Sequence, residues 1–201
     1  MSTALHDPLL PTTTPTHQGG TNASPESSTS RWSRHVAAVI RLSLGWVFLW
    51  AFLDKAFALG HGTGVDAQTG ATDYFGPAAW IHGGSPTAGF LGFGVDGPLA
   101  GFYSGLAGNA LVDWAFMIGL LGIGLALMLG IGMRIAAVSG VVLLVMMWSA
   151  TLPPANNLFM DDHLIYALVL ILLALIGAGR TWGLGKAWER IPVVQDHAFL
   201  Q

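Results

Sequence analysis

Eight side chains that can carry charge, exchange protons or donate hydrogen bonds fall near one end of the apolar segments of this 201-residue chain. Ionisable groups in such segments are costly to place in a membrane and mark functional sites by default. Acid, cation, imidazole and phenol groups together can hydrogen-bond the carbonyls of a quinone and transfer its protons. A packed ion network that fixes the order of the helices is the alternative. The eight are Asp54, Lys55, Asp113, Trp148, Asp161, Asp162, His163 and Tyr166.

The first apolar segment carries two cations, Arg41 and Lys55, 14 positions apart. That spacing is close to four helical turns, so both share a stripe with Phe48. Lys and Arg near opposite ends of a span can snorkel to the interface, and this is the expected role of Arg41. For Lys55 a paired or functional role is favoured. Asp54 lies about 100° away on the helix, so it is not expected to pair with Lys55.

In the last apolar segment, His163 and Tyr166 share a helical face with small residues. Small residues let helices approach closely in lipid, so this face is expected to point into the bundle. Asp161 or Asp162 is expected to cap the start of this helix, and Asp113 to cap the second span, because carboxylates accept hydrogen bonds from free N–H groups there.

The composition identifies the environment in which these residues act. The chain is 53% hydrophobic and only 9% charged, its mean hydropathy is +0.59, and its net charge is -3. A soluble or disordered chain would carry far more charge, and a nucleic-acid partner would require a basic surface. The absence of Cys excludes disulfides and thiolate-held iron–sulfur clusters. An integral membrane protein is therefore predicted.

Four apolar runs predict an all-α, four-helix membrane bundle, since each is near the length that crosses a bilayer as a helix. Their approximate bounds are Val36–Leu59, Val112–Met133, Ile135–Leu152 and His163–Gly179. Apart from Arg41 and Lys55, every Lys and Arg falls on one side of this arrangement, and segments 60–111 and 153–162 contain none. The positive-inside rule then predicts a multi-pass protein of the cell membrane with both termini cytoplasmic.

Three segments lie outside these spans. Residues 1–30, rich in Ser, Thr and Pro, are expected to form a disordered cytoplasmic tail, and residues 191–201 a C-terminal cytoplasmic tail. The extracytoplasmic loop 60–111 is too long to be structureless in a compact protein. We expect it to form an apolar cap on the outer membrane surface with short interfacial helices, one of them opened by Pro98.

Several other chemistries are not expected. A transmembrane haem needs two facing His ligands, whereas His35 and His163 are predicted at opposite ends of the bundle. His61 and His82 match no metal-ligand spacing, and no metal site is expected. The glycines between 119 and 132 are expected to serve close helix packing.

Three segments resemble the DoxX/DoxD family of small four-span membrane proteins: RLSLGWVFLWAFLDKAF (41–57), GIGLALMLGIGMR (122–134) and DDHLIYALVLILLALIGAGRTWGLG (161–185). The resemblance covers about residues 31–190, and the long outer loop is similar to that of the DoxD branch. That branch is the membrane subunit of thiosulfate:quinone oxidoreductase, whereas other DoxX-like proteins resemble membrane anchors of oxidative-stress complexes.

The resemblance implies a quinone-linked oxidoreductase subunit, with membrane lipid, a membrane quinone and a soluble redox subunit as partners. Lys55, His163 and Asp113 are the expected catalytic residues: Lys55 would attract the thiosulfate dianion, and His163 with an Asp would handle quinol protons. The quinone would be bound by Trp148, Tyr166 and Asp162. A non-catalytic membrane anchor is the alternative function, and a small-solute carrier ranks last because no inverted repeat or broken helix is visible.

Overall fold

The computed structural model describes residues 28–155 and 157–200. Within these residues the chain is helical and forms no β-strand beyond an isolated bridge between Val65 and Thr72. The all-α prediction is therefore confirmed for the described chain. The predicted disordered tail lies almost wholly outside these residues, and its last three positions belong to the first helix.

Four helices form the body of the molecule: α1 (Ser28–Phe57), α4 (Ala110–Leu129), α5 (Met133–Ala150) and α6 (Asp162–Leu175). The first three are long and apolar enough to cross a membrane. The fourth is apolar but has only 14 residues, or about 21 Å of helix, against about 30 Å of hydrocarbon. A left-handed Gly177 and the short helix η2 (Ala178–Arg180) follow it, where a longer span was expected.

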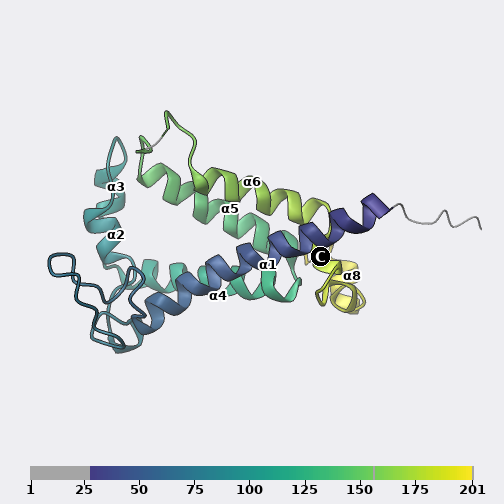
Figure 1. Cartoon of the computed structure of the whole chain (residues 1–201), viewed down its shortest axis with the longest axis horizontal. Helices are drawn as coiled ribbons and strands as arrows, with labels where there is room; N and C mark the ends of the chain where they lie inside the picture. Colours follow the sequence, from purple (N-terminus) through teal and green to yellow (C-terminus); the bar gives the residue numbers. More distant parts are fainter. Residues whose placement is uncertain (1–27, 156, 201) are drawn as a thin grey trace, which may run out of the picture.

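The four helices associate as two pairs, α1 with α4 and α5 with α6. Figure 1 shows the pairs close together at the end where α1 begins and the C-terminal segment lies, and further apart at the opposite end. Two short helices of the outer loop, α2 (Ala88–Phe93) and α3 (Ala100–Ser104), stand across that opposite end. The pairs therefore diverge toward the end where the sequence places its candidate site.

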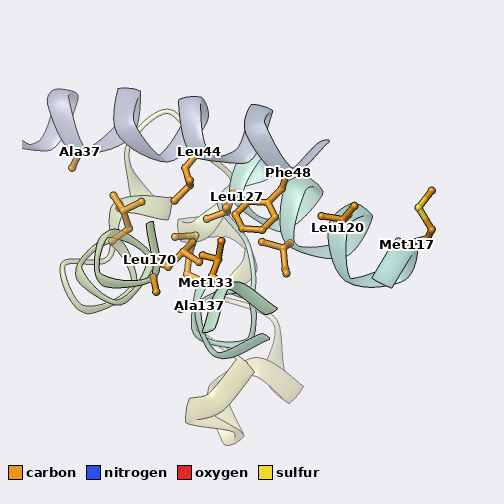
Figure 2. Packing of buried hydrophobic residues seen from close by; sticks show 14 of the residues in the cluster. Ala37, Leu44, Phe48, Met117, Leu120, Leu127, Met133, Ala137 and Leu170 are labelled. Carbon is orange, nitrogen blue, oxygen red and sulfur yellow. The ribbon is translucent and has the colours of Figure 1, made fainter. Parts of the chain in front are cut away.

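Close packing inside each pair depends on glycine. A Cβ at Gly124 would lie 2.8 Å from the backbone nitrogen of Leu49, and one at Gly140 would lie 2.5 Å from Leu170. Figure 2 shows Leu44 and Phe48 pointing from α1 toward Leu127 of α4 in the apolar core. The expected packing role of glycine is thus confirmed at Gly124. It is wrong at Gly119, Gly122 and Gly132, where an added Cβ would meet no atom within 4 Å.

The outward faces of all four helices are apolar and exposed. Leu111 on α4 is 81% exposed, Val138 on α5 67% and Leu175 on α6 80%. A soluble domain rarely exposes so much contiguous apolar surface, whereas lipid tails cover it without cost. The exposed surface therefore agrees with the membrane environment predicted from composition.

Arg41 does not snorkel. Its side chain is fully buried, and its guanidinium donates to the carbonyls of Leu127, Met128 (3.1 Å), Thr181 (3.2 Å) and Trp182 (2.9 Å). The first two belong to the last turn of α4, where carbonyls have no partner within the helix. Arg41 therefore joins the end of α4 to the turn after α6, and snorkelling was the wrong expectation.

The glycines around this arginine allow two turns to touch. A Cβ at Gly130, after α4, would lie 2.7 Å from the carbonyl oxygen of Gly179, and one at Gly179 would lie 2.3 Å from that of Gly130. Gly130 also has a φ of +72°, which favours glycine. These contacts hold the two helix pairs together at this end of the bundle.

The outer loop is ordered by carboxylates. The buried Asp54 accepts hydrogen bonds from the backbone nitrogens of His61 (2.9 Å) and Thr63 (3.0 Å), where the chain leaves α1. Further along, hydrogen bonds from Thr69 and Gln68 lower the pKa of Asp66 below its ordinary value. The short helix expected near Pro98 is present as α3, two residues later, whereas α2 and the turn η1 (Trp80–His82) were not predicted.

The C-terminal segment is folded rather than extended. It contains α7 (Gly185–Trp188), α8 (Pro192–Asp196) and η3 (Ala198–Leu200). Arg134 donates to the carbonyl of Ala198 and Trp188 to that of Leu200, each at 2.6 Å. Glu189 accepts from Arg180 at 2.8 Å and raises the pKa of that arginine above its ordinary value. This segment therefore closes the end of the bundle at which Arg41 lies.

Candidate functional site

A cavity of about 370 Å³ lies where the helix pairs diverge. Ligand pockets for small molecules fall between about 300 and 1,000 Å³, so its size suits an organic molecule. Its wall is mostly apolar and comes from α1, α4, α5 and the outer loop, with Phe48, Phe90, Phe116 and Met147 among the lining residues. A flat apolar ring system can pack against such a wall.

Four of the polar residues that line the cavity come from two helices. Lys55 comes from the end of α1, and Asp162, His163 and Tyr166 come from the first turns of α6. The sequence predicts all four as site residues, and the structure brings them to one cavity although more than 100 positions separate Lys55 from the others. Tyr166 lies one turn after His163, which confirms that these two share an inward face.

His163 is held by the residue that begins its helix. Asp161 caps α6 by accepting from the backbone nitrogen of Leu164 at 3.2 Å, which confirms the expected cap. Its other carboxylate oxygen lies 2.7 Å from Nδ1 of His163. Asp162 is 3.9 Å from the same nitrogen and its side chain is 71% exposed. The imidazole therefore has one close partner, Asp161, which is among the eight candidates but was expected only to cap the helix.

Lys55 has a different environment. It is half-buried on the cavity wall and makes no hydrogen bond or ion pair with any residue the structure describes. The expected separation from Asp54 is confirmed, because that carboxylate caps the start of the outer loop instead. Neither Asp113 nor Asp161 pairs with the ammonium group within the described chain, so a ligand in the cavity can accept its hydrogen bonds.

Asp113 does not line the cavity and does not cap α4. The cap is Asn109, whose side chain accepts from Leu111 at 3.0 Å. Asp113 is buried and accepts from the hydroxyls of Ser85 (3.0 Å) and Thr87 (2.5 Å), and from the backbone nitrogen of Thr87 (3.2 Å). The capping expectation was wrong because Asn109 precedes the helix, whereas Asp113 already lies within it.

The carboxylate of Asp113 nevertheless affects the cavity indirectly, through Thr87. Thr87 lies on the cavity wall, and Phe90 and Leu91 of the adjoining helix α2 follow it there. By holding Thr87 against α4, Asp113 positions this part of the outer loop over the cavity. The contacts of Asp113 fix the part of the outer loop that covers the cavity, and Asp113 itself does not line it.

Trp148 also supports the site indirectly. Its indole nitrogen donates to the carbonyl of Phe159 at 2.6 Å, and the side chain does not line the cavity. Phe159 lies two residues before the Asp161 cap, so the bond steadies the turn that leads into α6. The structure thus places Trp148 beside the expected site rather than in it.

Sequence reasoning missed Tyr103, which is buried on the cavity wall and bonded through its hydroxyl to Ser149 at 2.6 Å. Its aromatic neighbours in the outer loop are the only signal that could have drawn attention to it.

The ligand atoms of Asp161, Asp162 and His163 lie within 4.8 Å of one another. Because the Asp161 carboxylate already serves Leu164 and His163, hydrogen bonding accounts for this cluster.

Comparisons of the chain with protein-family models, with curated proteins and with solved structures found no match. The site must therefore be interpreted from its own geometry. It is a mostly apolar cavity, covered by the outer loop, whose polar lining includes the ammonium group of Lys55, the carboxylate of Asp162, the imidazole of His163 and the phenols of Tyr103 and Tyr166.

Proposed function

We propose that this chain is a four-span protein of the cell membrane, similar to the DoxX/DoxD family, with both termini in the cytoplasm. The apolar outer faces of all four helices support the spans, α6 included. The fold places the start of α1 and the C-terminal segment at one end, as an even number of spans requires (Figure 1). Arg134 at the start of α5, Arg180 in η2 and Lys186 in α7 also lie at that end, in keeping with a cytoplasmic location.

The cavity, we propose, binds the head group of a membrane quinone, and the chain is a quinone-linked oxidoreductase subunit. One observation carries this proposal: Lys55, His163 and Tyr166, brought together from α1 and α6, line a single apolar cavity of about 370 Å³. The apolar wall can hold a quinone ring, and the three polar groups can hydrogen-bond its oxygens.

Thiosulfate is the proposed electron donor. Two thiosulfate ions form one S–S bond and release two electrons, which with two protons reduce the quinone to quinol and leave tetrathionate. Lys55 is the one cation among the described residues that line the cavity, and it can attract the dianion or hold a quinone oxygen. His163 can pass protons to the reduced oxygen.

Activity of the purified chain tests this function. The protein alone, in detergent, is mixed with thiosulfate and a short-chain ubiquinone analogue, and quinone absorbance is followed. The proposal predicts thiosulfate-dependent loss of absorbance that Lys55→Met diminishes and Lys186→Met, at the other end of the molecule, does not. A separate melting curve with the analogue alone should show a rise in melting temperature, because a ligand that binds only the folded state stabilises it.

A membrane anchor for a soluble redox protein is the second candidate. One observation favours it: the C-terminal end of the molecule exposes Trp182 (59%), Val193 (60%) and Phe199 (61%). Exposed apolar side chains of this kind suit a protein contact. Co-purification of a soluble oxidoreductase, combined with no quinone binding by this chain, would favour the anchor.

A further inference from the structure

The two carboxylate oxygens of Asp161 have different hydrogen-bond partners. One accepts the N–H of Leu164 at 3.2 Å and so is fixed by the first turn of α6. The other lies 2.7 Å from Nδ1 of His163. The side chain is only 14% exposed, and the imidazole 24%. The helix start therefore holds an acceptor beside one nitrogen of a ring that lines the cavity.

An ionised carboxylate can only accept hydrogen bonds, so the ring must donate from Nδ1. In the neutral imidazole the second nitrogen, Nε2, then carries the free lone pair. We infer that Asp161 is a positioning residue that fixes His163 in this tautomer, so that Nε2 is the atom that exchanges a proton with the ligand of the cavity. For the identity of that ligand, this inference rests on the proposed quinone function.

The path of the transferred proton follows from the tautomer. When the ring is charged, its Nε2–H bond breaks as an O–H bond forms on one quinone oxygen, and the ring returns to the neutral Nδ1–H form. The second proton, for the other quinone oxygen, comes from solvent, and solvent also reprotonates Nε2 before the next turnover. The electrons come from the oxidation of thiosulfate, two for each quinone. The Nδ1 proton stays on the ring throughout, because it forms the hydrogen bond to the Asp161 carboxylate and is not transferred.

Among the residues that the structure describes, no other carboxylate near the ring can replace Asp161. Asp162 is the second carboxylate, but its oxygen is 3.9 Å from Nδ1, beyond hydrogen-bonding distance, and it is largely exposed. Lys55 and Tyr166 also line the cavity, and both have hydrogens to donate. The neutral imidazole of His163, with a free lone pair on Nε2, adds a hydrogen-bond acceptor to the two donors of the cavity wall.

The tautomer can be measured without any enzyme activity. Protein with ¹⁵N-labelled histidine is studied by NMR in detergent, at a pH where the ring is neutral, and His163 is assigned by the signal lost in His163→Gln. The wild-type protein should show the proton on Nδ1. Asp161→Asn should move it to Nε2, because the amide can still cap α6 while its NH₂ group donates to Nδ1.

A second variant, Asp161→Ser, keeps a good helix cap but is too short to reach the ring. Both variants should melt close to the wild-type temperature and lose the Nδ1–H preference. In the quinone assay, Asp161→Asn should lower kcat at least about tenfold, which is less than the roughly 10²–10⁴-fold contributed by general acid–base catalysis as a whole. Asp96→Asn removes the same charge from an exposed loop position and should change neither the tautomer nor kcat.

Three results would overturn the inference. The first is a wild-type His163 protonated on Nε2, and the second is an Asp161→Asn protein that keeps the Nδ1–H tautomer. The third is loss of the tautomer with unchanged kcat, since Nε2 would then not exchange the ligand's proton. If no variant, nor the wild-type protein, reduces quinone, the proposed function fails. The NMR result still decides the role of Asp161 in that case.

Discussion

Arg41 and Lys55 lie on one stripe of α1 and have opposite environments. The stripe follows from their 14-residue spacing, and the sequence predicts it correctly. The partners of Arg41 could not be predicted, because they are backbone carbonyls of residues 127–128 and 181–182, which carry no sequence signal. Lys55 has no such partners within the described chain, which leaves it available to a ligand.

Replacement of Arg41 by Met should destabilise the fold. The change leaves buried carbonyls at the end of α4 and after α6 without their donor, and each unsatisfied buried group costs about 1–3 kcal/mol. We expect the free energy of unfolding to fall by about 3 kcal/mol or more, measured by denaturant titration in mixed micelles. An Arg41→Met protein as stable as the wild type would show that these contacts contribute nothing.

Replacement of Lys55 by Met should leave stability almost unchanged. The side chain makes no hydrogen bond or ion pair with the described residues, and an apolar chain of similar length fills the same space. Quinone reduction, measured on the same preparation as the melting temperature, should fall at least about tenfold if Lys55 holds a ligand oxygen, since hydrogen bonds to charged groups contribute about 1.5–3 kcal/mol. Wild-type values for both would remove Lys55 from the site.

At the scale of elements, the sequence predicts the long helices to within a few residues, except the first, which begins eight residues early. Continuous apolar runs locate helices well because only a helix satisfies their backbone in lipid. The outer loop shows the opposite case. Helix α2 has six residues and depends on the bonds of Asp113 to Thr87, a contact across 26 positions that no local pattern reveals.

Two glycines on α4 should respond oppositely to the same change. Gly124→Ala places a methyl group 2.8 Å from the backbone of α1, and overpacking of this kind costs about 1–3 kcal/mol. Gly122→Ala meets nothing within 4 Å and should be neutral or stabilising by up to about 1 kcal/mol, because alanine favours helix. Thermal melting of the two variants provides a matched comparison, and equal effects would contradict the close α1–α4 contact.

Asp113→Asn should loosen the outer loop while leaving the bundle folded. Charge-assisted hydrogen bonds contribute about 1.5–3 kcal/mol, so weakening those to Ser85 and Thr87 should speed amide hydrogen exchange in residues 85–91 about tenfold. Asp96→Asn, on the same loop, is the control. Unchanged exchange together with lost quinone reduction would instead return Asp113 to the catalytic role that the sequence suggests.

At the scale of the whole molecule, the candidate site was predictable because its residues lie at the same depth along the helix bundle, although no sequence motif links them. Lys55 ends α1, and His163 and Tyr166 begin α6, so any bundle of these helices in up-and-down order brings them to the same end. Which of the eight candidates face the cavity was not predictable. That depends on how the pairs diverge from the end at which the glycine turns and Arg41 hold them in contact.

Whether α6 spans the membrane can be tested. The helix is about 21 Å long, whereas the chain must cross about 30 Å of hydrocarbon. Exposed Leu172 (54%) and Leu175 (80%) near its end, with Ile176 (54%) after it, extend the apolar length, and local thinning of the bilayer can supply the rest. The chain contains no cysteine, so single cysteines can be placed cleanly at Gln68, Leu158 and Gln195.

In sealed, right-side-out vesicles, an impermeant maleimide should label Gln68→Cys and Leu158→Cys from outside, and Gln195→Cys only after the membrane is opened. This pattern requires α6 to cross, because Leu158 precedes that helix and Gln195 follows it. With three spans, α6 would lie along the outer surface and Gln195→Cys would label from outside with the other two. That result would place Arg134 on the opposite side of the membrane from Ala198, whose carbonyl it binds at 2.6 Å. It would therefore contradict the fold as well as the topology.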